Sequence, residues 1–355
     1  MSLTAKALLI ILSSLVLAGF LWVSVVFLPF SSFLILTYSI FGVLLISAAF
    51  IGPQVAGKPR SLSLWEALLL FLIIMAIRLF SYAESGLLLE KIPMVLVVLF
   101  WAFSIKGWRA SQIGLTLKKL PLQLFLGLGF AVLYWILYQA TFALYTATSS
   151  GISAIHFFSY PQGVPPGISL DPVSFLLVLF FYSNFAEELF FRGFLLKEAL
   201  QGRRHFLLLF LFQALLFGFY HVNYALFPVE GGGIDWPFLG FYVAWTFLFG
   251  IGFAFAYLIS RSVLSNTILH VLANVMQSNW LFLFLPSSSG KAASSPVDAA
   301  LVFRESIVRP ALVINALIFA TVLGGIWVFF KRKSRVRAAP GMNLSSGQGS
   351  EDSSQ

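Results

Sequence analysis

Long runs of apolar residues, separated by short polar breaks, occupy most of the sequence. About 20 helical residues cross the roughly 30 Å hydrocarbon core of a bilayer, so an apolar run of this length predicts a membrane-spanning helix. The pattern predicts about ten spans, at about residues 7–29, 32–51, 64–82, 87–105, 121–147, 173–198, 206–227, 237–259, 263–286 and 309–330. The predicted fold is therefore all-α, a polytopic transmembrane helical bundle.

Two longer polar stretches divide this bundle, one rich in Gly, Ser and Pro before residue 173 and one after residue 286. The first apolar run is longer than the core of a signal peptide, about 7–15 residues, and is interpreted as a retained helix. We expect four parts, which are N-terminal transmembrane helices with an outer loop at 1–172, a helical core at 173–286, an outer loop with the last helix at 287–330, and a basic, then disordered, tail at 331–355.

The composition excludes a water-soluble fold, because 59% of the residues are hydrophobic, 10% are charged and the mean hydropathy is +0.94. The net charge of +9 does not indicate nucleic-acid binding, since most of the 22 Lys and Arg residues lie in short clusters between apolar runs and in the tail. With the N-terminus inside, these clusters fall on the cytoplasmic side. We expect a multi-pass protein of the bacterial inner membrane, with both termini cytoplasmic and membrane lipids as partners.

Cysteine is absent from the chain. Disulfides, thiol nucleophiles and thiolate metal sites are therefore all excluded. Any metal would depend on His and carboxylate ligands.

The predicted span at 173–198 contains ionisable residues, which cost about 2.5–3.5 kcal/mol each on insertion and are functional candidates for that reason. Glu188 and Arg192 are four residues apart on one helix face and can form an ion pair. Glu187 is rotated by about 100° and stays outside this pair. A buried structural ion pair beside one protonated glutamate is the alternative interpretation.

Two further spans carry histidine, His221 at 206–227 and His270 at 263–286, the latter followed by Asn274 on the same helix face. A single histidine on an apolar helix is more often a hydrogen-bonded packing residue. Two on different helices, beside an unpaired glutamate, favour a shared site, because each polar group in hydrocarbon needs a partner. We therefore expect Glu187, His221, His270 and Asn274 to converge on a wet cavity.

These four side chains have the chemistry of an amide hydrolase. A carboxylate with an imidazole can hold and deprotonate a water molecule, and a second imidazole with an amide can stabilise an oxyanion. Glu187, His221 and His270 are also the candidate ligands if Zn²⁺ is bound, with one position open for water. The zincin pattern H-E-x-x-H is absent from the sequence.

The two other histidines, which lie outside the predicted spans, and the charged residues near span ends are given simpler interpretations. His156 and His205 are interpreted as structural or solvated. The charged residues near span ends are expected to snorkel to the interface, and they are Glu66, Arg78, Glu84, Glu90 and Lys91.

Three motifs in order resemble the CPBP family, the CAAX-protease and bacteriocin-processing membrane proteins that include the type II CAAX prenyl endopeptidases. They are E-E-x-x-x-R at 187–192, F-x-x-x-H at 217–221 and H-x-x-x-N at 270–274. The resemblance covers about residues 173–286 and makes this segment the expected catalytic core. It implies that the protein is an intramembrane endopeptidase.

Carried over by motif, the resemblance implies that Glu187 and His221 activate the attacking water and that His270 and Asn274 stabilise the oxyanion. It also implies that Glu188 and Arg192 help to hold the site together. We favour a metal-free mechanism with no cofactor, and Zn²⁺ remains the alternative. The expected substrate is a peptide or protein near the membrane.

Two other functions are compatible with the sequence. A non-catalytic membrane scaffold or bacteriocin-immunity protein would keep the motif helices for packing. A transporter would use the polar face of the span at 263–286 as an ion path, but the sequence has no repeated halves of the kind that secondary transporters show.

Overall fold

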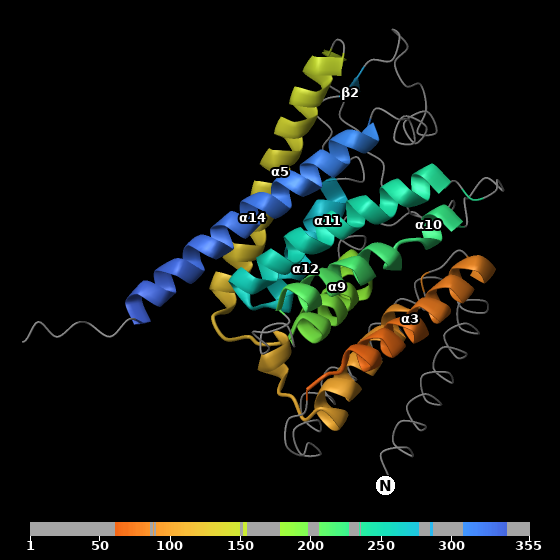
Figure 1. Cartoon of the computed structure of the whole chain (residues 1–355), viewed down its shortest axis with the longest axis vertical. Helices are drawn as coiled ribbons and strands as arrows, with labels where there is room; N and C mark the ends of the chain where they lie inside the picture. The colour runs from red at the N-terminus through yellow and green to blue at the C-terminus, as the bar shows by residue number, and fades with distance from the viewer. Residues whose placement is uncertain are drawn as a thin grey trace, which may run out of the picture.

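The computed structural model describes residues 61–85, 88, 90–149, 152–154, 178–197, 206–226, 234, 236–276, 285–286 and 308–338. These residues are almost entirely helical (Figure 1). The exception is a short antiparallel pair of strands, β1 (Ile152–Ala154) and β2 (Leu285–Pro286). The predicted spans at 7–29 and 32–51 and the predicted disordered tail lie outside the described residues.

Among the described residues, four helices are long and apolar enough to cross a membrane. They are α3 (Leu64–Ser85), α5 (Leu120–Ser149), α11 (Trp236–Ser260) and α14 (Val308–Ala338). Each of them coincides with a predicted span, and α14 continues through the basic run that follows its apolar part. The helical membrane fold is confirmed by these elements, while the number of ten spans stays a prediction.

Two helices of the predicted core, α9 and α12, are shorter than the apolar pattern suggested. Helix α9 (Phe206–Tyr220) ends in a turn at His221, and the short α10 (Asn223–Leu226) follows. The prediction of one unbroken helix over 206–227 is therefore wrong. Apolar residues continue on both sides of the turn, so hydropathy alone does not reveal it. Helix α12 (Val263–Val275) carries the second histidine.

The segment with the two adjacent glutamates is not a uniform α-helix. A single α-helical turn, α7 (Phe185–Glu188), lies between two π-helical segments, η3 (Val178–Asn184) and η4 (Leu189–Leu195). Short π-helical insertions are rare and occur frequently at functional sites. Every residue from Ala186 to Leu196 is buried, so this segment forms the centre of the described bundle.

The other helices surround this segment. Helix α11 packs against α9 and α14, and α12 packs against α5. Helix α4 (Lys91–Phe100), continued by the π-helical η1 (Trp101–Ile105), contacts α7 and η4. In Figure 1, α14 and α3 lie on opposite sides of α9 and α11.

Small residues allow α9 and α11 to approach closely. A Cβ atom on Gly218 would lie 2.9 Å from the carbonyl oxygen of Val243, and one on Gly250 would lie 3.1 Å from the Cα atom of Ala214. In lipid, such close backbone packing replaces the hydrophobic driving force that acts between helices in water. This packing fixes the end of α9, where His221 lies.

Candidate active site

Glu187, His221 and His270 lie together although they come from α7, the turn after α9, and α12. Oε2 of Glu187 lies 3.9 Å from Nε2 of His221 and 3.8 Å from Nε2 of His270. Both separations exceed a hydrogen bond, and this oxygen accepts no hydrogen bond from the described residues. The sequence analysis expected Glu187, His221, His270 and Asn274 to converge, and the structure brings the first three of them together.

The orientation of both imidazole rings follows from their second nitrogen. Nδ1 of His270 lies 2.8 Å from Oε1 of Glu188, and Nδ1 of His221 lies 2.8 Å from the carbonyl oxygen of Phe217. Carboxylate and carbonyl oxygens only accept hydrogen bonds, so Nδ1 is assigned the proton in each ring. Each ring therefore presents Nε2 to Glu187.

Glu188 is the other glutamate of α7, and its contacts join α7 to η4 and α12. The expected ion pair with Arg192 is present at 3.1 Å. Nδ2 of Asn266 donates to the other carboxylate oxygen at 3.0 Å, and the guanidinium of Arg192 lies 4.1 Å from the ring centroid of Phe217. Glu188 thus has a partner on each oxygen, and it also orients His270.

Helix α12 is fixed at its start by polar contacts with α5. Ser262 is the N-cap residue, and its hydroxyl accepts a hydrogen bond of 3.2 Å from the backbone N–H of Ser265. The hydroxyl of Ser265 in turn donates to the carbonyl oxygen of Gln123 at 2.7 Å. These contacts hold the helix that presents Asn266 and His270 to Glu188.

Asn274 lies one turn beyond His270 on α12 and is partly exposed. Residues four apart on an α-helix share a face, so Asn274 and His270 are on the same side of α12. His156 and His205 lie outside the described residues.

Lys91 is a site residue that the sequence interpretation missed. Its ammonium contacts Oε1 of Glu187 and lies 3.5 Å from the carboxylate of Glu90. The guanidinium of Arg78 contacts the same Glu90 carboxylate, and the hydroxyl of Tyr220 donates to it. The prediction that Arg78, Glu90 and Lys91 snorkel to the interface is therefore wrong, because their exposed fractions are 0%, 0% and 1%. Glu66 does lie at a helix start, where it pairs with Lys106 at 2.6 Å.

The alternative of a zinc site stays a prediction, with Glu187, His221 and His270 as its candidate ligands. Within the part of the chain that the structure describes, no group of three or more His, Cys, Asp or Glu side chains is arranged to hold a metal ion. Lys91 already places a positive charge on Glu187, which would compete with a cation bound to the same carboxylate. We therefore derive no step through a metal.

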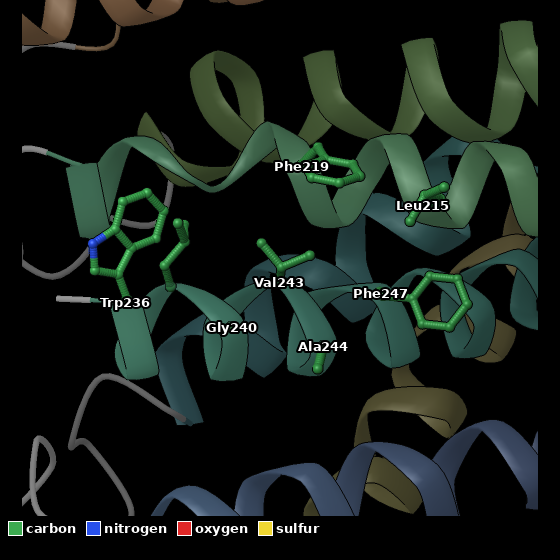
Figure 2. A pocket seen from close by; sticks show the side chains of 8 residues that line it. Leu215, Phe219, Trp236, Gly240, Val243, Ala244 and Phe247 are labelled. Carbon is green, nitrogen blue, oxygen red and sulfur yellow. The ribbon is translucent and has the colours of Figure 1, made fainter. Parts of the chain in front are cut away.

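A groove between α9 and α11 is separate from this cluster (Figure 2). Only apolar side chains and one glycine line it, and they are Leu215, Phe219, Trp236, Leu239, Gly240, Val243, Ala244 and Phe247. Because the lining has no ionisable group, the groove has no means of acid–base chemistry. Glu187 and His270 lie on the other side of α9, where the buried Phe217 contacts the ring of His270.

Comparison with known proteins gives one family match. Residues 169–276 match the family described as type II CAAX prenyl endopeptidase Rce1-like. The matched segment includes all three motifs, so the resemblance to CAAX proteases is confirmed there, and it supports an integral membrane protein of the peptidase class. Arg78, Glu90 and Lys91 lie outside the match. No curated protein matches the chain.

Proposed function

We propose that this protein is an intramembrane endopeptidase in which Glu187 and His221 activate a water molecule for attack on a peptide bond. One observation carries the proposal, which is that Oε2 of the buried Glu187 faces Nε2 of both His221 and His270 at 3.8–3.9 Å. Polar groups separated by this distance are suited to a bridging water. The family match supports hydrolysis of peptide bonds as the reaction.

The water molecule supplies the nucleophile. A water between Glu187 and His221 donates one hydrogen bond to Oε2 of the carboxylate and one to Nε2 of the ring. Its oxygen attacks the carbonyl carbon of the substrate while one proton passes to Glu187. The resulting tetrahedral intermediate collapses with cleavage of the C–N bond, and Glu187 returns the proton to the leaving amine.

His270 and Asn274 are proposed to stabilise the oxyanion of that intermediate. The hydrogen bond from Nδ1 of His270 to Glu188 adds a condition, because Nε2 can donate only when both ring nitrogens carry protons. The proposal therefore assigns the doubly protonated ring to His270 during the reaction, where Glu188 accepts hydrogen bonds from both His270 and Arg192. Glu188 and Arg192 hold the site together without touching the substrate.

The substrate class and the location belong to the same proposal. The substrate is a membrane-associated protein or peptide, since the reactive side chains lie within a bundle of apolar helices. Nucleic acid has no part in the function. The distribution of basic loops supports both termini in the cytoplasm, with the inner membrane of a bacterium as the location.

Replacement of Glu187 by Gln tests the proposal. The amide keeps an oxygen for Lys91 and removes the base, so hydrolysis should fall by about 100-fold or more. The probes are a fluorogenic peptide with a farnesylated cysteine three residues before its C-terminus, and the membrane proteome of cells producing wild-type or E187Q protein, in which uncleaved precursors should accumulate.

Glu66→Gln is the matched control, because Glu66 is also a lysine-paired glutamate but lies at the start of α3, away from the histidines. It should cleave as the wild type does. Unchanged cleavage by E187Q would refute the proposal, and full rescue of a cellular phenotype by E187Q would favour a non-catalytic scaffold.

A further inference from the structure

A chain of buried charges links Glu187 to two helices outside the family match. It runs from Arg78 on α3 to Glu90 at the start of α4, then to Lys91 and finally to Glu187 on α7. The ring of Tyr220 lies beneath both cations, with centroid distances of 4.0 Å to Arg78 and 4.8 Å to Lys91. All of these side chains are at least nine-tenths buried.

The charges in this region balance one for one. Arg192 forms an ion pair with Glu188, and Arg78 forms one with Glu90. Among the described residues, Lys91 is thus the permanent cation within ion-pair distance of Glu187. The other titratable side chains within that distance of Glu187 are His221 and His270. A buried carboxylate without a cation takes a proton rather than stay ionised. The ionised form of Glu187 consequently depends on Lys91.

The contact also fixes which oxygen of Glu187 faces the histidines. Lys91 occupies Oε1, and Oε2 is the oxygen that faces both Nε2 atoms. If the ammonium were absent, neither oxygen would be held, and the carboxyl group could turn about its last bond. One contact therefore sets both the charge and the direction of the base.

We propose that Lys91 is a positioning residue that keeps Glu187 ionised and turned with Oε2 toward His221 and His270, so that the working site includes α3 and α4. This inference rests on the proposed function only for its effect on hydrolysis. The protonation state of Glu187 is a property of the resting protein and can be measured without a substrate.

Infrared spectroscopy of purified protein in lipid nanodiscs measures that state. A protonated carboxylic acid has a carbonyl stretch that a carboxylate lacks, and subtracting the spectrum of E187Q in the same background assigns the band to Glu187. At neutral pH the wild type and Lys91→Arg should lack the band. Lys91→Met and Lys91→Gln should both show it, because a contacting cation changes the proton affinity of a carboxylate by about 10- to 1,000-fold.

Lys106→Met is the matched control. Lys106 is buried and pairs with a glutamate, as Lys91 does, but that partner is Glu66. Its loss removes a lysine–glutamate pair without touching Glu187, so the Glu187 band should stay absent. If Lys91 were merely structural, Lys91→Met would reduce the amount of folded protein, as Lys106→Met would. Neither variant would then show the Glu187 band.

Each outcome decides the inference. An ionised Glu187 in folded Lys91→Met or Lys91→Gln overturns it. If both neutral variants fail to fold, adding Glu187→Gln to Lys91→Met should restore folding, because the uncompensated carboxylate is then gone, and failure to restore it overturns the inference. Hydrolysis by E187Q would instead refute the proposed function and leave the infrared result standing, so the two failures are distinguishable.

Discussion

Removing the guanidinium of Arg192 tests how the second carboxylate is held. Arg192 and Glu188 are both fully buried and lie 3.1 Å apart. Leaving one partner of a buried pair uncompensated costs about 3–5 kcal/mol. The guanidinium also stacks on Phe217 at 4.1 Å, which adds about 0.5–2 kcal/mol. Since Glu188 keeps its hydrogen bonds from Asn266 and His270, we expect Arg192→Met to lower the free energy of unfolding by about 4 kcal/mol.

That loss is large beside a typical free energy of unfolding of about 5–15 kcal/mol. The assay is the fraction of folded protein recovered in detergent, followed by thermal unfolding of the recovered protein. The double variant Arg192→Met with Glu188→Gln removes the whole pair and should regain most of the stability, although it should not regain hydrolysis.

The reasoning depends on coupling between the two residues. In a double-mutant cycle, residues that contact each other show an interaction energy of about 0.5–3 kcal/mol, whereas independent sites add. If the destabilisation of the double variant equals the sum of the single ones, or if Arg192→Met is as stable as the wild type, the buried pair does not hold the site.

Two further predictions concern packing and metal. Gly218→Val should lower the free energy of unfolding by about 1–3 kcal/mol, because its side chain would meet the carbonyl of Val243, whereas Gly240→Val, with nothing within 4 Å, should leave the melting temperature unchanged. Equal melting temperatures for the two variants would contradict the close approach of α9 and α11. Prolonged dialysis against a chelator should leave peptide cleavage unchanged, and elemental analysis of the purified protein should find far less than one zinc per chain; stoichiometric zinc whose removal abolishes cleavage would establish the metal mechanism instead.

Much of the described fold could be predicted because the apolar runs that encode its long helices are uninterrupted. Helices α3, α5, α11 and α14 follow from uninterrupted apolar runs, which report length and lipid exposure directly. The meeting of Glu187 with His221 and His270 could also be predicted, since polar side chains in hydrocarbon must find partners. The ends of α9 and the π-helical segments beside α7 could not, because hydropathy does not change where the hydrogen-bond pattern changes.

Lys91 was missed because a charged side chain near the end of an apolar run can be stabilised in two ways. Its long side chain can reach the interface, or it can turn inward to a partner on another helix, and sequence position does not separate these cases. A count of charges would have pointed inward, because Glu187 and Glu188 lie near the middle of their span with Arg192 as the one cation within a turn or two, while Lys197 and Glu198 lie at its end. One more buried positive charge was needed, and Arg78 and Lys91 were the nearest candidates in the preceding spans.

The counter-ion of Glu187 is donated by a helix outside the segment that defines the family match. A fragment of residues 169–276 would therefore contain Glu187 and Glu188 but lack Lys91, so that Arg192 would be the only cation paired with these two buried glutamates. Such a fragment would carry every motif and still lack electroneutrality at its centre. If Lys91 has the proposed role, the catalytic unit includes α4, together with Arg78 of α3, which balances the neighbouring Glu90.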